Sequence, residues 1–304
     1  MNSTWKEVVV NQTSCFSLEF TTFHFILTFA KLLLTIVATI ATLFLSKQLL
    51  RDCDSKIPFY VRFLIFNVCV SYIFKNLYLL YKSLANILVH VTGTSHLHIT
   101  YSTCAIEQIF FVVPSTSRHL SFLFIGTERL FKTFYFPNCN ESNKLFLMLS
   151  IISLVATWIL PLLLHFALLD YNRGIVCFCV LSKIWSDNYV KLFAIFLTIL
   201  PLITVSIYCI VYYRNRSILS KFVIKVISRN LTERFIQWSN VKVSGWLIPV
   251  TVISLMISVS GTILALIIRL CRVVNNDTDI TMVTSIIGTV YVLDNVSFPF
   301  LCVR

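Results

Sequence analysis

The chain has 304 residues, of which 57% are hydrophobic and only 12% are charged. Soluble domains are about 45 to 50% apolar and about 25% charged, so this composition argues against a soluble protein and favours lipid as the solvent. The net charge is +12, but Lys and Arg fall in short gaps between apolar runs rather than on one basic face, so we expect no nucleic-acid partner. No linker or repeat divides the chain, and residues 1–304 are predicted to form one domain.

Seven apolar stretches are long enough to cross a bilayer as helices. A membrane helix needs about 20 apolar residues, because it rises about 1.5 Å per residue through about 30 Å of hydrocarbon. Strands would need a closed barrel of short alternating segments, and no such alternation occurs. We therefore predict an all-α membrane protein, a seven-transmembrane helix bundle. The predicted segments are 23–45, 57–81, 103–125, 145–169, 190–213, 246–268 and 280–303.

The distribution of basic residues predicts the orientation of these segments. With the amino terminus outside, the inner loops and the carboxyl end hold fourteen of the 25 Lys and Arg residues, and the outer side holds seven. Inner loops are normally the richer in Lys and Arg, so we predict an outside amino terminus and an inside carboxyl terminus. Asn2 and Asn11 then lie outside in Asn-x-Ser/Thr patterns, as candidate glycosylation sites. The same pattern recurs at inner or membrane positions, namely Asn140, Asn215, Asn230 and Asn295.

Three cysteines are candidates for a disulfide on the outer side. Cys104 lies at the predicted outer end of segment three, and Cys177 and Cys179 lie in the loop between segments four and five. All would face an oxidising compartment, where disulfides persist. A bridge from Cys104 to either partner would staple this loop across the bundle mouth, whereas Cys15 is a competing partner and unpaired thiols are the alternative. Three other cysteines fall in apolar runs and are expected to pack as small apolar side chains: Cys69, Cys209 and Cys302.

An acid–base pair, Glu128 and Arg129, ends the third segment. Such a pair can hold an inactive state through a local ion pair and release the Arg to a partner when the bundle opens. The alternative is an interfacial Arg whose side chain extends to the surface. The longest inner loop, 214–244, carries seven basic residues and one acid. It predicts either a docking surface for a cytosolic partner or a basic helix on anionic lipid.

Ionisable residues at membrane depth are costly unless paired or hydrated, so each is a functional candidate. The set is Lys31, Arg62, Lys75, Glu107, Arg118, His119 and Asp294. Asp294 could pair with Lys31 or with Arg118, and Glu107 with Arg118 is another option. An interfacial position is predicted instead for Arg62, Lys75 and Glu107. Prolines that can bend helices fall in four segments, at Pro161, Pro201, Pro249 and Pro299.

No catalytic constellation is recognisable in the sequence. It lacks a Gly-rich phosphate loop, GxSxG and HExxH. His96 and His98 stand in the first outer loop without a further ligand cluster, so a solvated loop is favoured over a metal site. We therefore expect no enzyme activity, no cofactor and no bound metal.

Two stretches, at the inner ends of segments three and six, carry a family resemblance. Residues 128–133 read Glu-Arg-Leu-Phe-Lys-Thr, and residues 231–240 read Leu-Thr-Glu-Arg-Phe-Ile-Gln-Trp-Ser-Asn. They are similar to Glu-Arg-x-x-Ala-(Thr/Ser) and Leu-Ser-x-Arg-(Tyr/Phe)-Gln-x-x-Glu-Asn of the nematode serpentine chemoreceptors of the alpha superfamily, with classes alpha, alpha-beta, beta and epsilon. Class epsilon is the nearest. Lys132, Ile236 and Ser239 depart from the family pattern.

The resemblance implies a chemosensory G-protein-coupled receptor in the plasma membrane of sensory cilia. An external small molecule or peptide would bind in the outer half of the bundle, among helices three, five, six and seven, and a heterotrimeric G protein would bind inside. The switch or coupling positions would be Glu128, Arg129, Arg234 and Phe235.

Two alternatives to a signalling receptor stay open. One is a secondary transporter or ligand-gated channel with an ion path through Lys31, Arg118 and Asp294. The other is a divergent receptor that no longer signals. The reason for this second alternative is that segment seven runs almost to Arg304 and no amphipathic helix follows it. Such an end fits either a short family member or a truncated sequence.

Overall fold

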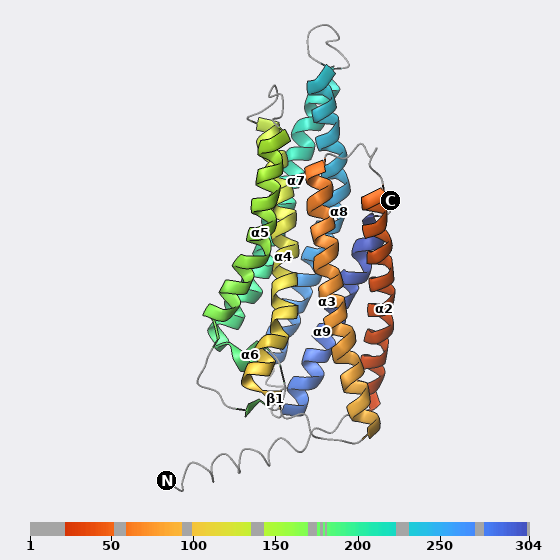
Figure 1. Ribbon diagram of the computed structural model, residues 1–304, viewed down its shortest axis with the longest axis vertical. Helices are drawn as coiled ribbons and strands as arrows, with labels where there is room; N and C mark the ends of the chain where they lie inside the picture. The colour runs from red at the N-terminus through yellow and green to blue at the C-terminus, as the bar shows by residue number, and fades with distance from the viewer. Residues whose placement is uncertain are drawn as a thin grey trace.

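The computed structural model describes residues 22–51, 59–92, 99–134, 143–169, 175–176, 179, 181–222, 231–270 and 277–302. Within these ranges the chain forms seven long helices, one short helix and a sheet of two short strands (Figure 1). The helices are α2 (Thr22–Arg51), α3 (Phe59–Thr92), α4 (Tyr101–Phe134), α5 (Asn143–Ala167), the short α6 (Leu181–Ile184), α7 (Asp187–Phe222), α8 (Leu231–Leu270) and α9 (Asp277–Cys302). The antiparallel strands are β1 (Ile99–Thr100) and β2 (Ile175–Val176). The predicted all-α bundle of seven helices is confirmed.

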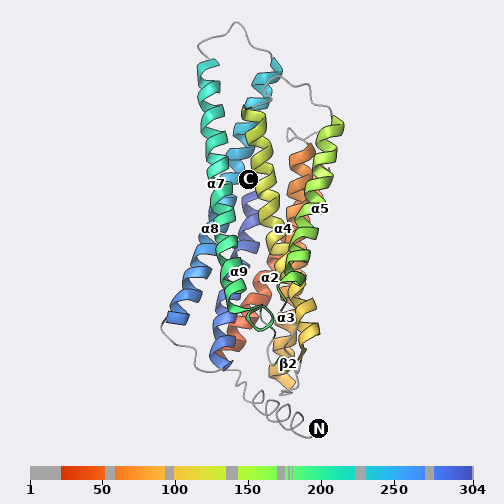
Figure 2. The same cartoon turned by 90° about the vertical axis from the view of Figure 1, so that its left-hand side faces the viewer.

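Six of the long helices form a closed ring. They contact one another in the order α2, α3, α4, α7, α8 and α9, and α9 returns to α2. Helix α5 packs outside this ring against α3 and α4, while α4 also reaches α8. Helix α4 is therefore central to the bundle, as both views show (Figures 1 and 2).

The two ends of the bundle differ. One end carries β1, β2 and α6 and is called the strand end here; the other is the opposite end. At the opposite end α7 and α8 extend beyond the remaining helices (Figures 1 and 2), in keeping with their lengths of 36 and 40 residues. These extensions hold much of the basic stretch that the sequence places between segments five and six.

The outer surface of the bundle is apolar. Large side chains such as Ile40 at 63% exposure, Leu163 at 61% and Met256 at 67% point away from the bundle. Monomeric soluble proteins rarely expose contiguous apolar patches larger than a few hundred Å². Five helices are long and apolar enough to cross a membrane, and two shorter apolar helices accompany them among the described residues. The surface and the helix lengths fit a helical membrane protein.

Each predicted segment corresponds to one long helix, but several helices are longer than predicted. Helix α4 continues to Phe134 instead of ending at residue 125, and α8 begins at Leu231 instead of residue 246. Hydropathy detects only the apolar part of a helix, whereas backbone hydrogen bonds continue through polar residues beyond it. The structure also places Pro114 inside α4, a fifth helical proline that the sequence analysis missed.

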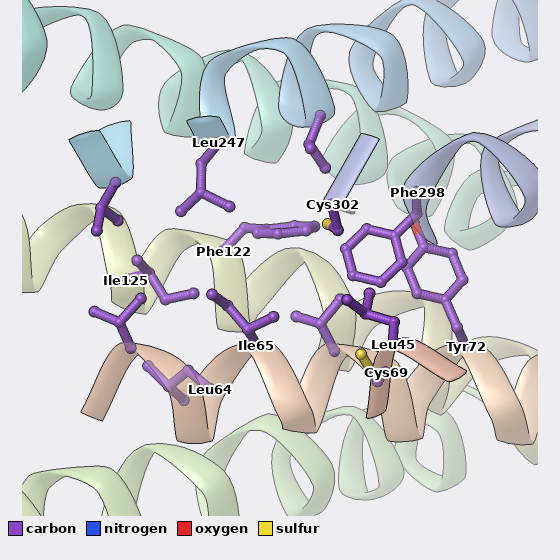
Figure 3. Packing of buried hydrophobic residues seen from close by; sticks show 14 of the residues in the cluster. Leu45, Leu64, Ile65, Cys69, Tyr72, Phe122, Ile125, Leu247, Phe298 and Cys302 are labelled. Atoms are coloured by element: carbon purple, nitrogen blue, oxygen red, sulfur yellow. The ribbon is translucent and has the colours of Figure 1, made fainter. Parts of the chain in front are cut away.

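The main core lies where α2, α3, α4, α8 and α9 meet (Figure 3). Tyr72 and Phe298 stack with ring centroids 4.4 Å apart, and Phe122 meets Phe298 edge-on at 6.2 Å. Cys69 and Cys302 are buried as free thiols in the same cluster, as expected for small apolar side chains. Tyr72 of this core also contacts Arg118, so the core is continuous with the buried polar groups described in the next subsection.

Candidate functional site

A disulfide joins α4 to the connection between α5 and α7. Cys104, near the start of α4, is bonded to Cys179, with their Cα atoms 5.3 Å apart. The predicted bridge is confirmed, and Cys179 is the partner; Cys177 lies outside the described residues. Because β1 directly precedes α4 and pairs with β2 in the same connection, the connection is held to α4 both covalently and by the sheet.

Side chains also anchor this connection to the strand end. The Tyr101 hydroxyl donates to the Ile184 carbonyl at 3.0 Å. Trp185 is fully buried, with its ring 5.6 Å from that of His165. His165 Nε2 in turn donates to the Ala105 carbonyl at 3.0 Å. The connection is therefore a packed part of the bundle.

Polar contacts continue from the disulfide into the bundle. Glu107 forms an ion pair with Lys82 of α3, so the option of a Glu107–Arg118 pair is wrong. Gln108 Nε2 donates to the Tyr78 hydroxyl at 3.2 Å and to the Cys179 carbonyl at 3.4 Å. These contacts tie α3, α4 and the disulfide-bonded connection together.

A buried ion pair links α4 and α9 deeper in the bundle. Arg118 and Asp294 form it, and both side chains are 3% exposed; Asp294 therefore pairs with Arg118 and not with Lys31. Arg118 Nη1 also donates to the Tyr72 hydroxyl at 3.0 Å, and its Nη2 lies 2.6 Å from His119 Nε2. Because a guanidinium only donates, His119 accepts through an unprotonated Nε2.

Two buried lysines differ from Arg118 in having no carboxylate partner among the described residues. Lys75 is 2% exposed, and its Nζ lies 5.6 Å from the Phe111 ring centroid and 5.5 Å from that of Tyr291. The bundle encloses the Lys75 side chain, and its position near a membrane interface stays a prediction. Lys31 is 8% exposed, and its Nζ is 3.7 Å from where a Cβ would stand on Gly288 of α9.

Asn67 is a polar centre that the sequence analysis missed. Its Nδ2 donates to Ser121 of α4 at 2.9 Å and to Thr157 of α5 at 3.2 Å. Its Oδ1 accepts a hydrogen bond from Trp158 Nε1 at 2.8 Å. The amide thus fixes α5 against α3 and α4. The sequence feature that could have identified Asn67 is its position as a polar residue among apolar ones on α3.

The predicted acid–base pair lies near the opposite end of α4. Arg129 Nε is 2.8 Å from Glu128 Oε2, and Lys132 Nζ is 2.8 Å from Glu128 Oε1. The side chains of Arg129, Lys132 and Glu128 are 1%, 7% and 8% exposed. The local ion pair is therefore present, Arg129 is buried rather than extended to the surface, and Lys132 competes for the same carboxylate.

Arg129 also connects three helices. Its Nη1 donates to Asn240 Oδ1 of α8 at 3.0 Å. The Thr133 hydroxyl accepts from Asn240 Nδ2 at 3.3 Å and from Asn215 Nδ2 of α7 at 2.9 Å, and donates to the Arg129 carbonyl at 2.7 Å. The two sequence stretches that carry the family resemblance therefore meet, through Arg129, Thr133 and Asn240.

The other two predicted coupling residues are Arg234 and Phe235. Both are exposed near the start of α8. The Phe235 ring lies 6.2 Å from that of Trp238, and Lys242 Nζ is 5.0 Å from the Trp238 ring centroid. They form an exposed aromatic and basic surface on the extension of α8.

The comparisons with known proteins add no family to this geometry. No protein-family model matches this chain. No curated protein matches its sequence. Membership of a receptor family and the function that follows from it are therefore proposals, which rest on the two motifs and on the contacts between them.

Several predicted positions lie outside the described residues. These are Asn2, Asn11, Cys177, His96 and His98. Of the further Asn-x-Ser/Thr positions, Asn215 and Asn295 are buried at 1% and 0% exposure. Asn295 Nδ2 donates to Asn76 Oδ1 at 2.7 Å, so this amide serves helix packing.

Proposed function

We propose that this chain is a seven-pass chemosensory G-protein-coupled receptor of the nematode serpentine kind. Its strand end would face outside and admit a small molecule or peptide. The Cys104–Cys179 disulfide and the packed α5–α7 connection support this, because they give that end a fixed frame. The apolar surface of the bundle supports a location in a membrane. The plasma membrane of sensory cilia is the location that the resemblance implies, and it is part of the proposal.

The observation that carries the proposal is the buried contact of Arg129 with Asn240 and Glu128. It joins α4 to α8 at the end where both α7 and α8 extend outward. Buried charges are costly unless paired, and this pair holds the arginine in the bundle by a few specific contacts. Separation of α8 from α4 would break the Asn240 contact and free Arg129 for a cytosolic partner, the heterotrimeric G protein.

Coupling between the two ends would be a shift between closed and open bundles. A ligand can favour the open state only by binding it more tightly than the closed state. Allosteric couplings of this kind are typically about 1 to 3 kcal/mol. The structure has the Arg129–Asn240 contact in place, so it corresponds to the closed state in this proposal.

The proposal is tested by expressing the chain with candidate G proteins and screening odorant and peptide pools for second-messenger responses. Arg129→Ala should abolish the ligand response while the protein still reaches the cell surface. Arg51→Ala is the matched control, since Arg51 is an exposed arginine at the end of α2. A ligand response that is unchanged in Arg129→Ala would refute the role of this residue.

A further inference from the structure

The strand-end half of the bundle holds more buried positive than negative charge. Lys31, Lys75 and Arg118 are all buried, and they come from α2, α3 and α4. Among the described residues the one buried carboxylate facing them is Asp294, which Arg118 takes. Within the described part of the chain, Lys31 and Lys75 are therefore left without a carboxylate partner, in surroundings where an isolated charge is expensive.

Both unneutralised lysines face one side of α9. Lys31 approaches Gly288, and Lys75 approaches the ring of Tyr291. Gly288 and Tyr291 are three residues apart, so they lie one above the other on the same helix face, about 4.5 Å apart along the axis. Asp294 is the next position on this face, and Arg118 occupies it.

This part of α9 is also open. All six residues from Ile286 to Tyr291 are partly exposed, although six residues turn through more than one and a half turns of helix. Nearer the opposite end, Val292, Asp294 and Asn295 are buried, and Leu293 between them is 48% exposed. Beside the two lysines α9 is therefore partly exposed on every side, whereas at the level of the Arg118–Asp294 pair it has a buried side and an exposed side.

We propose that Lys75 and Lys31 form the binding site for an organic anion, which enters from the strand end and lies against α9 above the Arg118–Asp294 pair. This names the ligand class of the proposed receptor and rests on that function. It places the ligand among the first, second, third and seventh long helices, instead of among the third, fifth, sixth and seventh as expected from the sequence. The anion neutralises the Lys75 ammonium, while the rings of Phe111 and Tyr291, both near the Lys75 Nζ, contact its apolar body. A carboxylate or sulfate with an aliphatic or aromatic body has this chemistry.

The test is direct binding to the purified full-length protein in detergent, which does not depend on signalling. The probes are octanoate, phenylacetate and octyl sulfate, each paired with an uncharged analogue of the same body: methyl octanoate, methyl phenylacetate and octanol. We expect anions to raise the thermal unfolding temperature in a saturable manner and the uncharged partners to bind at least about tenfold more weakly, since a buried charge then stays unpaired. The carboxylate and sulfate arms distinguish the two kinds of head group.

Lys75→Met removes the charge and keeps the length of the side chain. This variant should lose at least about tenfold in affinity for the anions and should unfold at a higher temperature than the wild type without ligand, since an unpaired buried charge is removed. Lys82→Met is the control, because Lys82 lies two turns away on α3 and is already paired with Glu107. If Lys75→Met does not fold, Lys31→Met is measured in its place.

The possible outcomes separate this site from the receptor function. Equal binding of anions and uncharged analogues, equal binding to wild type and Lys75→Met, or no binding of any probe would each overturn the anion site. Signalling in response to neutral ligands alone would also overturn it and leave the receptor proposal standing. Anion binding that depends on Lys75, without any G-protein response, would support the site and count against the receptor.

Discussion

The carboxylate of Glu128 is shared between two cations, Arg129 and Lys132, each 2.8 Å from a different oxygen. Lys132 stands where the resembling family has a small residue, so this sharing is a property of the present chain. A charge-assisted hydrogen bond contributes about 1.5 to 3 kcal/mol. Lys132 therefore weakens the ion pair between Glu128 and Arg129. We expect both Glu128 and Lys132 to affect the fraction of receptor that is in the open state without ligand.

Glu128→Gln should raise ligand-independent signalling, because an uncharged amide no longer attracts either cation. Lys132→Ala should lower it, because Glu128 then serves Arg129 alone. A change of about tenfold in the ratio of open to closed states corresponds to about 1.4 kcal/mol. The measurement is basal second-messenger production at matched surface expression, and a change of the same sign in both variants would contradict the shared-carboxylate explanation.

Asn67→Ala should destabilise the folded bundle, because it removes the hydrogen bonds of Asn67 with Ser121, Thr157 and Trp158 together. The Ser121 and Thr157 hydroxyls still donate within their own helices, whereas Trp158 Nε1 loses its acceptor, and a buried polar group left without a partner costs about 1 to 3 kcal/mol. The readout is thermal unfolding in detergent, with Ser206→Ala as the control, since Ser206 is exposed and bonds only to its own helix. Equal unfolding temperatures for the two variants would show that the Asn67 contacts contribute no net stability.

The pairing of charged residues could be predicted from the sequence better than the hydrogen bonds of asparagine side chains. The Glu128–Arg129 pair could be predicted because its partners are adjacent in the chain, and Asp294 with Arg118 was one of two options. Asn67 and Asn240 were missed as partners because their bonds join residues 54 to 111 positions apart. The burial of Lys75 could not be predicted because it depends on how α3 packs against the neighbouring helices.

Among the elements, the α5–α7 connection is held to α4 by one disulfide, in addition to the β1–β2 pairing and the Tyr101–Ile184 hydrogen bond. Cys104→Ser and Cys179→Ser should therefore have equal effects on stability and surface expression, and the double variant should add nothing further. Loss of a native disulfide typically costs about 2 to 5 kcal/mol in small secreted domains, and the loop closed here spans 75 positions. Thermal unfolding without reductant measures the effect.

Cys177→Ser is the matched control for this prediction, because Cys177 was the alternative partner two positions away. It should unfold like the wild type. If Cys177→Ser were as destabilising as Cys179→Ser, the effect could not be assigned to the Cys104–Cys179 bridge alone.

The number and order of the helices followed from hydropathy, whereas their ends did not. An apolar window marks the part of a helix that avoids water, but α7 and α8 continue through basic residues that hydropathy assigns to a loop. The basic stretch after segment five was predicted to continue that helix, and α7 does so as far as Phe222. The early start of α8 could not be predicted in this way, since its first turns contain polar residues and the contacts of Asn240 with α4 join distant parts of the chain.

The arrangement of the whole bundle depends on contacts that one sequence does not reveal. The ring that closes between α2 and α9, and the position of α5 outside it, join segments far apart in the chain. Charge asymmetry did give a testable orientation, with the strand end outside. That orientation also separates the receptor from an insect-type odorant-gated channel, which has seven segments in the opposite orientation.

An epitope placed before residue 22 should be accessible to antibody on intact cells, and Asn2 and Asn11 should carry glycans, because the proposed receptor has its amino terminus outside. Glycosidase treatment should then shift the wild type on a gel, and Asn2→Gln combined with Asn11→Gln should remove the shift. An epitope detected only after permeabilisation, together with an unglycosylated chain, would reverse the topology and favour the channel.

Pro249 divides α8 into two arms of similar length, because it lies near the middle of a helix that runs from Leu231 to Leu270. Proline removes one backbone hydrogen bond and provides a place to bend. Asn240 is nine residues from Pro249, about 13 Å along the axis, so a bend of about 10° would carry it about 2 Å sideways. That displacement exceeds what its 3.0 Å bond to Arg129 tolerates. A bend of α8 at Pro249 that leaves the helix contacts of the outer half nearly intact would thus be enough to break the Arg129–Asn240 hydrogen bond.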